Sequence, residues 1–135
     1  MHALGRPEDE PLGFVLHRTA RELADRFKVN LEIDVDDSIT ADSDQRHALM
    51  RITREAVSNA VRHGDAHRVQ VRLLREGEQR QLAISDDGKG FDVDRAFAHG
   101  SGYGLISMRD RARSLPGSFS LDAECGRGSL VTVKW

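Results

Sequence analysis

The first part of the chain alternates between a helical and a strand-like spacing of apolar residues. A helix is predicted over residues 12–27, because apolar residues recur there about every 3.6 positions. They are Leu12, Val15, Leu16, Ala20, Leu23 and Phe27. A half-buried strand is predicted over residues 29–35, where apolar and polar residues alternate strictly. The acidic segment Asp36–Asp37 followed by Ser38 ends that strand.

The longest periodic stretch runs from Ala41 to His63 and predicts a second helix. Asp42 and Asp44 favour its N-terminal turn, where acidic side chains meet unpaired N–H groups and the positive end of the helix dipole. Gly64 is well placed to end it. The stripe expected to be buried consists of Leu49, Ile52, Thr53, Ala56 and Ala60.

Strands with a period of two dominate the remainder. They are predicted at residues 68–74, 81–85, 118–123 and 130–134, and a helix is predicted at 104–115. Runs of antiparallel strands with helices on one face indicate an α/β two-layer sandwich, here with a mixed, largely antiparallel five-stranded sheet. We expect residues 1–11 to form a flexible lead-in and residues 12–135 to form one domain.

The composition of the chain excludes some classes of function but does not indicate a particular one. The 135 residues carry a net charge of −2, which gives no electrostatic reason to expect nucleic acid binding. No apolar run approaches the ~20 residues of a membrane span, so no direct membrane contact is expected. The single cysteine, Cys125, cannot form an internal disulfide, which fits a reducing cytoplasm and a role as a small packing residue.

The second helix carries a polar pair with a possible role in metal binding. Glu55 and Asn59 are four residues apart, so their side chains share one face beside the buried stripe. An Asn amide oxygen can complete the octahedral shell of Mg²⁺, which takes its other ligands from water and phosphates. Arg62 and His63 extend that face and can place positive charge beside phosphates. The alternative is a solvated helix face with an ordinary polar pair.

A second candidate segment, Asp86–Gly90, follows a predicted strand. A carboxylate held at a strand end can accept a hydrogen bond from the exocyclic amino group of adenine, which guanine lacks at that position. Gly88 and Gly90 let the backbone approach a planar base, since no Cβ stands in the way. The alternative is a glycine-rich turn, because Asp-Gly is a common turn pair.

A third candidate segment, residues 100–104, contains three glycines and precedes the helix predicted from Gly104. Backbone N–H groups at a helix start make a ready site for a triphosphate, and the 11 residues Phe91–Ser101 are expected to form a short lid. The alternative is a plain loop with a helix cap. The chain has neither the P-loop spacing nor the Gly-x-Gly-x-x-Gly spacing of dinucleotide-binding folds.

In this order the segments resemble the ATP-binding catalytic domain of sensor histidine kinases. That domain has the Bergerat fold, in the superfamily of type II topoisomerases, mismatch-repair ATPases and heat-shock chaperones. Residues 54–63 resemble the N-box, residues 86–90 the G1 box and residues 102–105 the G2 box. Residues 104–112 are similar to the subfamily of nitrate/nitrite sensor kinases, which also have short lids.

The resemblance implies a role for each matching residue. Asn59 is expected to coordinate Mg²⁺, and Asp86 to bind the adenine amino group. Ser129 stands where the family often has a Thr near the adenine, and Glu55 matches the acid of the N-box, a candidate general base. The residues expected to shape the ATP pocket are Gly88, Gly90, Gly102, Tyr103, Gly104 and Leu105.

The resemblance also implies a partner. In the family, the phosphoacceptor histidine lies on a separate dimerisation hairpin, and His17 is preceded by too few residues to belong to one. We therefore expect His17 to be a surface residue, and the chain to act on the dimerisation domain of a parent kinase that serves a response regulator. An anti-sigma factor of the same superfamily, which phosphorylates Ser, is the alternative function. A decayed site that only mediates interactions is the third.

Overall fold

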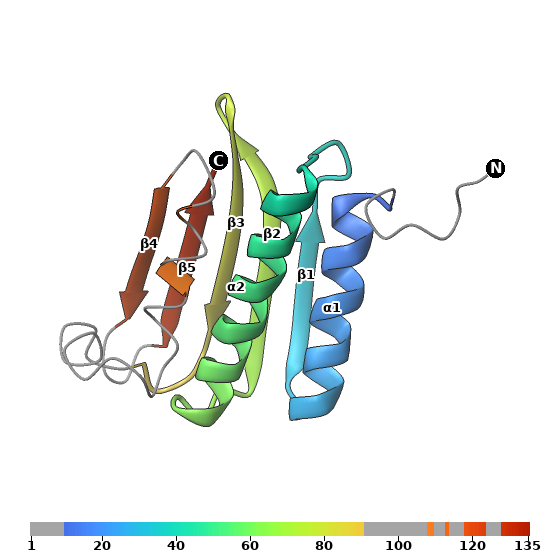
Figure 1. The fold of residues 1–135 in the computed structure, drawn as a ribbon. Coiled ribbons are helices and arrows are strands. Elements are labelled where there is room, and N and C mark those ends of the chain that lie inside the picture. The colour runs from blue at the N-terminus through green and yellow to red at the C-terminus, as the bar shows by residue number, and fades with distance from the viewer. Residues whose placement is uncertain (1–9, 91–107, 110–112, 114–117, 124–127) are drawn as a thin grey trace.

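A computed structural model of the chain describes residues 10–90, 108–109, 113, 118–123 and 128–135 (Figure 1). In chain order, its elements are α1 (Leu12–Phe27), β1 (Asn30–Val35), α2 (Ser43–Arg62), β2 (Arg68–Glu76), β3 (Gln79–Asp86), β4 (Ser118–Ala123) and β5 (Ser129–Lys134). The bounds of all these elements lie within two residues of those predicted from the apolar pattern. The helix predicted over 104–115 is not among them. Of that helix only Met108, Arg109 and Arg113 belong to the described residues.

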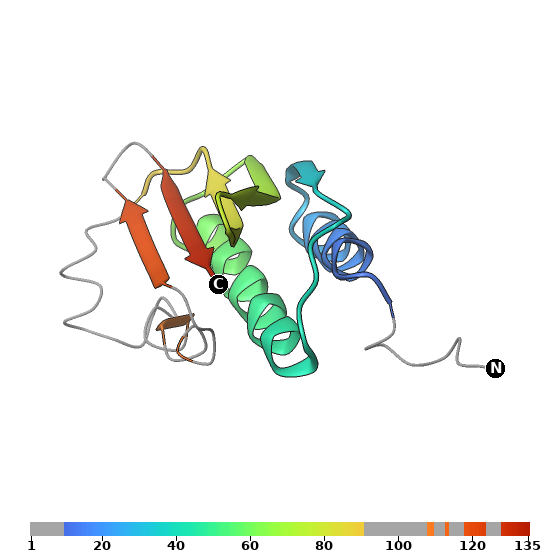
Figure 2. The same ribbon diagram turned by 90° about the horizontal axis from the view of Figure 1, so that it is seen from above.

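The strands form one mixed sheet in the order β1-β2-β3-β5-β4. Strand β1 pairs with β2 in parallel, whereas the other three pairings are antiparallel. Both long helices lie on the same face of the sheet, as the view from above shows (Figure 2). The α/β sandwich class predicted from the sequence is therefore confirmed.

The core lies between that face of the sheet and the two helices. Alternate residues of the central strands point into it because side chains in a strand alternate between faces. These are Val69, Val71 and Leu73 on β2, Leu82 and Ile84 on β3, and Val131 and Val133 on β5. The five residues of the stripe predicted on α2 are all buried, with Ile52 and Thr53 fully inaccessible. This packing fixes the rotation of α2 and places Glu55 and Asn59 at the border of the core.

Both ends of α2 have identifiable causes. Asp42 is the N-cap: its carboxylate accepts from the backbone N–H of Gln45 at 2.8 Å, and the Gln45 side chain accepts from the Asp42 N–H at 3.1 Å. This reciprocal pair is a capping box. After the helix, a Cβ on Gly64 would lie 2.7 Å from the Ala60 carbonyl oxygen. The left-handed backbone conformation falls on Asp65, with φ of 51°, and not on Gly64.

At the other side of the molecule, α1 packs tightly against the end of β1. A Cβ on Gly13 would lie 2.3 Å from Cγ1 of Val35, so glycine is required for this approach. Strand β1 is an edge strand, and its apolar residues are only half-buried. None of the helices in the described part of the chain has the length and apolar character that crossing a bilayer requires.

Candidate functional site

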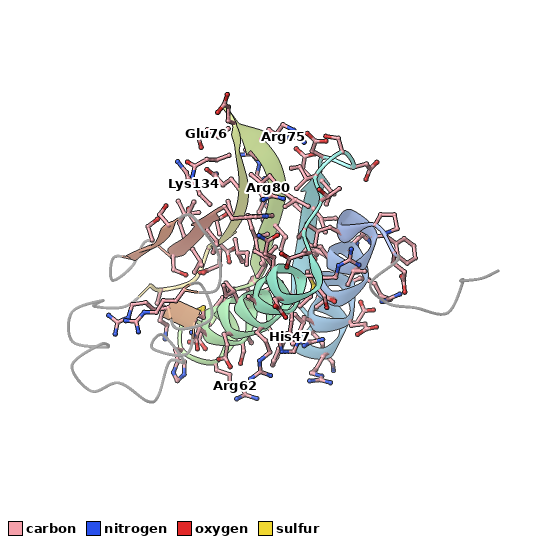
Figure 3. All side chains as sticks on the ribbon, turned by 45° about the horizontal axis from the view of Figure 1, so that its top comes forward. His47, Arg62, Arg75, Glu76, Arg80 and Lys134 are labelled. Carbon is pink, nitrogen blue, oxygen red and sulfur yellow. The ribbon has the colours of Figure 1, made fainter. Side chains whose placement is uncertain are left out.

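The described site candidates gather at one end of the sheet. There α2 and β3 end, while β2 and β5 begin (Figure 1). The register of the sheet sets Val69 opposite Asp86, and Ser129 is the first residue of β5. Arg62 lies at this end, whereas the charged residues Arg75, Glu76, Arg80 and Lys134 lie at the opposite end (Figure 3). Arg62 and Ser129, which are 67 positions apart in the sequence, thus lie at the same end of the sheet.

Asp86 is the last residue of β3, and both oxygens of its carboxylate are engaged. Oδ1 accepts from the backbone N–H of Gly88 at 2.8 Å, and Oδ2 accepts from the hydroxyl of Ser129. The two donors come from different segments, since Gly88 follows β3 and Ser129 opens β5. They fix the orientation of the half-buried carboxylate. The structure therefore brings together three residues named from the sequence, Asp86, Gly88 and Ser129.

Two glycines allow the backbone to close around Asp86. A Cβ on Gly88 would lie 2.6 Å from the Gly64 carbonyl oxygen and 2.9 Å from Oδ1 of Asp86. A Cβ on Gly128 would lie 2.2 Å from the carbonyl oxygen of Asp86, and Gly128 also has a φ of 78°. Gly90, at the end of the same loop, has a φ of 67°. The glycines thus serve close packing of the protein's own backbone in addition to any role toward a ligand.

Asp87 was not singled out from the sequence, although it makes three hydrogen bonds to His67 and Arg68. Its Oδ1 accepts from the backbone N–H groups of His67 and Arg68, each at 2.9 Å. Its own N–H donates to the carbonyl oxygen of Arg68 at 3.2 Å. The hydrogen bonds from Arg68 and then His67 hold the pKa of the Asp87 carboxyl below its ordinary value. Asp87 therefore binds the loop after β3 to the turn before β2.

A neighbouring ion pair joins the same two segments. Lys89 Nζ lies 2.7 Å from Oδ2 of Asp65, and the Lys89 backbone N–H donates to the Gly64 carbonyl at 2.6 Å. The hydrogen bond and charge of Lys89 lower the pKa of Asp65, and those of Asp65 raise the pKa of Lys89. Both side chains are largely exposed, at 71% and 65%, so solvent screens the pair strongly.

On α2, the polar face predicted from the sequence borders the core. Asn59 is only 8% exposed, and Glu55, one turn earlier, is half-buried. His63 is exposed and caps the helix, where its N–H donates to the Asn59 carbonyl at 3.0 Å. The guanidinium of Arg62 lies 5.9 Å from the centre of the Phe27 ring at the end of α1, which is a cation–π arrangement. The predicted contact of Arg62 with phosphates stays a prediction.

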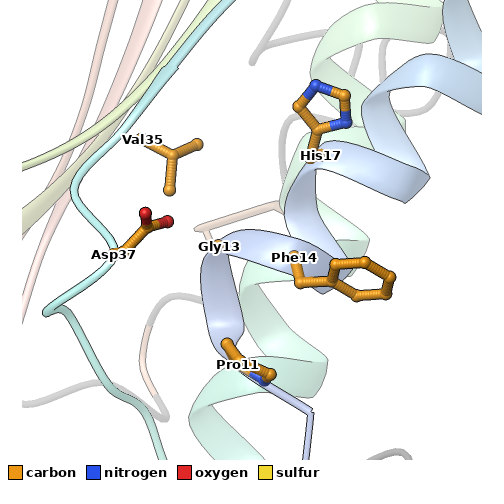
Figure 4. Close-up of a pocket in the computed structure, with 6 residues that line it drawn as sticks. All are labelled: Pro11, Gly13, Phe14, His17, Val35 and Asp37. Atoms are coloured by element: carbon orange, nitrogen blue, oxygen red, sulfur yellow. The ribbon is translucent and has the colours of Figure 1, made fainter.

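Four of the predicted residues, Gly102, Tyr103, Gly104 and Leu105, lie outside the described residues. Within the described ranges, no three His, Cys, Asp or Glu side chains gather as they would around a protein-held metal ion. A cavity of about 400 Å³ is found elsewhere, between the first turns of α1 and the end of β1 (Figure 4). It is lined by Pro11, Gly13, Phe14, His17, Val35 and Asp37, none of which belongs to the candidate site.

Comparison with known proteins identifies the class to which this arrangement belongs. Residues 44–135 match the family described as histidine kinase-, DNA gyrase B- and HSP90-like ATPases. Because the match covers most of the chain, including every candidate segment from α2 onward, the chain belongs to this family.

Among curated relatives, sensor histidine kinase LiaS of Bacillus subtilis is 32% identical over an alignment of 149 positions, which covers 98% of this chain and 41% of that protein. Sensor protein VraS of Staphylococcus epidermidis is 40% identical over 86 positions, covering 64% of this chain and 24% of that protein. The chain thus spans less than half the length of these relatives.

Solved structures show the same fold. The histidine kinase domain of the blue-light activated histidine kinase from Erythrobacter litoralis EL346 aligns with a TM-score of 0.80 and 20% identity, covering 99% of this chain and 64% of that one. The histidine kinase AdeS of Acinetobacter baumannii aligns with a TM-score of 0.68 and 20% identity, covering 91% of this chain and 61% of that one. The architecture is therefore that of histidine kinase domains.

Proposed function

We propose that residues 12–135 form the ATP-binding catalytic domain of a two-component sensor histidine kinase, working in the cytoplasm. The domain binds Mg²⁺–ATP and presents the γ-phosphate to a histidine on a separate dimerisation domain of the parent kinase. That kinase in turn serves a response regulator. The observation that carries the proposal is the carboxylate of Asp86, oriented by Gly88 and Ser129 at the sheet end where α2 also ends.

Asp86 suits adenine because an ionised carboxylate only accepts hydrogen bonds and the adenine amino group only donates them. Its half-buried position strengthens such a bond relative to one in water. Guanine has a carbonyl oxygen at the corresponding position, which the carboxylate would repel. We therefore expect a preference for adenine nucleotides.

The donor atoms of α2 fit a magnesium ion that arrives with the nucleotide. Asn59 offers an amide oxygen and Glu55 a carboxylate, and Mg²⁺ prefers hard oxygen ligands. Few protein ligands suffice, since phosphates and water complete the shell. When bound, the ion would neutralise charge on the phosphates. Asn59 would hold it, and Glu55 is placed one turn away to orient a reacting group.

Phosphoryl transfer requires little covalent chemistry from the protein, because catalysis is mostly positioning and charge stabilisation. An imidazole nitrogen of the partner histidine forms the new bond to phosphorus, while the bond to the bridging oxygen breaks and ADP leaves. Residues of this chain would hold the base, the ribose end and the phosphates in line. The glycine segment 100–104 is proposed to cover the phosphates.

Isothermal titration calorimetry with a non-hydrolysable ATP analogue, with and without Mg²⁺, tests the site. Asp86→Asn should weaken binding on the order of 100-fold, because the new amide NH₂ faces the amino group of adenine. The fold should survive, since the amide can still accept from Gly88 and donate to Ser129. Asp34→Asn, a charge-matched change on the exposed side of β1, should leave affinity unchanged. Equal affinity in Asp86→Asn and the parent would refute the role of Asp86.

An assay of phosphoryl transfer to a partner protein distinguishes a histidine kinase from the alternative, an anti-sigma factor that phosphorylates Ser. With a phosphoacceptor hairpin of a related sensor kinase and labelled ATP, we expect label that is lost in acid, as a phosphohistidine is. Acid-stable label on Ser would support the alternative. The sensor histidine kinases among the relatives do not favour that alternative.

A further inference from the structure

We propose that Asp87 is a positioning residue for the nucleotide site, although it takes no part in binding the nucleotide itself. Its carboxylate and the backbone N–H groups of His67 and Arg68 form a clamp between the loop 86–90 and the turn 64–67. This inference rests on the proposed function, because it concerns what holds that site in shape.

The geometry of the clamp is specific. One oxygen of Asp87 accepts both N–H groups at 2.9 Å, and the Asp87 N–H returns a bond to the Arg68 carbonyl at 3.2 Å. Backbone donors at the start of β2 cannot swing away as side chains can. The carboxylate is therefore held at one position relative to the sheet. An ionised acceptor makes such bonds shorter and stronger than neutral ones.

The two adjacent acids, Asp86 and Asp87, have different hydrogen-bond partners. Asp86 turns its carboxylate to Gly88 and Ser129, whereas Asp87 turns its carboxylate to the segment before β2. The loop is thereby fixed from both sides. If the Asp87 bonds were lost, Gly88 and Asp86 could shift together, because they are bonded to each other.

The turn 64–67 is itself bonded to the last turn of α2. The N–H of Asp65 donates to the Val61 carbonyl at 3.2 Å, and the N–H of Ala66 donates to the Ala60 carbonyl at 2.9 Å. Asn59 lies in that same turn of the helix. A continuous path of hydrogen bonds thus runs from the end of α2, through the turn, to Asp87. Together with the bond from the Lys89 N–H to the Gly64 carbonyl, the clamp therefore helps to fix the position of the proposed adenine ligand Asp86 relative to the proposed magnesium ligand Asn59.

The ion pair between Asp65 and Lys89 joins the same segments, yet it serves as the control. Both side chains are mostly exposed, and pairs of this kind contribute little to stability. Asp65→Asn removes the charge and keeps a residue that tolerates the left-handed conformation found there. Nucleotide affinity in this variant should stay within about twofold of the parent.

Three substitutions at Asp87 test the clamp by calorimetry with an ATP analogue, at a temperature where circular dichroism shows each variant folded. Asp87→Ala removes both bonds and should weaken binding about tenfold. Asp87→Asn keeps an oxygen that can accept both N–H groups and should restore affinity to within about threefold. Asp87→Glu keeps the charge but moves the carboxylate by one methylene, and should weaken binding as Ala does.

Unchanged affinity in Asp87→Ala would overturn the proposal. If that variant does not fold, unchanged affinity in Asp87→Glu overturns it instead. A loss of nucleotide affinity in Asp87→Asn equal to that in Asp87→Ala also overturns the proposal. The negative charge of Asp87, and not the geometry of its hydrogen bonds, would then be what supports binding.

A second readout needs no nucleotide and separates this inference from the proposed function. The amides of His67 and Arg68 should exchange with deuterium at least about tenfold faster in Asp87→Ala than in the parent. If the parent binds no nucleotide, the proposed function fails. The exchange result then still decides whether the clamp exists, and equal exchange in the two proteins would refute it.

Discussion

Replacing Gly128 by Ala tests how closely the entry to β5 approaches Asp86. The added Cβ would lie 2.2 Å from the carbonyl oxygen of Asp86 and 3.4 Å from its Oδ1. Real Cβ atoms do not approach backbone oxygen so closely, so one of the two segments must move. Either movement displaces Asp86 relative to Ser129, which directly follows Gly128.

The expected cost has two parts. Alanine in the left-handed conformation, here with φ of 78°, costs about 1 to 2 kcal/mol. Relief of the clash by a shift of packed backbone adds about 1 to 3 kcal/mol. The total is about 2 to 5 kcal/mol, a large share of the stability of a domain of this size.

Gly77→Ala is the matched control because it isolates the cost of placing alanine in the left-handed conformation. Gly77 lies in the turn between β2 and β3, at the opposite end of the sheet, with a φ of 62° and no atom within 4 Å of an added Cβ. It should cost only about 1 to 2 kcal/mol. Nucleotide affinity should stay unchanged, since this turn is remote from Asp86.

Urea denaturation followed by circular dichroism gives the two free energies of unfolding, and calorimetry gives the two affinities. We expect Gly128→Ala to be the less stable variant and to bind the ATP analogue at least about tenfold more weakly than Gly77→Ala. Equal destabilisation in the two variants would refute the close approach. Unchanged affinity in a destabilised Gly128→Ala would show that Asp86 does not depend on it.

Two further predictions concern stability. Asp42→Ala should lower the free energy of unfolding by about 1 kcal/mol, because it removes the oxygen that caps the helix. Asp42→Asn keeps that oxygen for Gln45 and should lower the free energy of unfolding little. Urea denaturation measures both variants, and equal losses would contradict the capping box. The lowered pKa of Asp87 means that its contribution to stability is complete above its ordinary value near 3.8 and is lost as the pH falls through the lower pKa of the folded state. The stability of the parent relative to Asp87→Asn should therefore decline below about pH 4, and a constant difference between pH 7 and pH 3 would contradict this.

Regular elements were predictable because they depend on local patterns. The period of α1 and the alternation in β2 follow from side-chain geometry alone, and each is read within one segment of the chain. The end of α2 was harder to predict in detail. The residue in the left-handed conformation is Asp65, whereas Gly64 is needed because a Cβ there would clash with the helix. That distinction depends on the Ala60 carbonyl oxygen, whose position becomes known only when the helix is in place.

Candidate site residues could be named from the sequence where a side chain has a recognisable chemical role, as Asp86 and Asn59 do. Asp87 escaped notice because its partners are backbone N–H groups about 20 residues away, and a backbone donor has no sequence signature. Its one signal, Asp before Gly, also fits an ordinary turn. The cation–π partner of Arg62 is hidden for a similar reason, because the pairing with Phe27 depends on how α1 and α2 pack.

The position of β5 between β3 and β4 has a consequence for synthesis on the ribosome. Strand β5 follows all other described strands in the chain, yet it occupies an interior place in the sheet. Until it emerges, β3 presents an open edge, and Asp86 has no Ser129 to orient it. Pairings over such long sequence separations form late, because loop closure must precede them. A nascent chain should therefore be unable to capture ATP until almost the entire domain has been made.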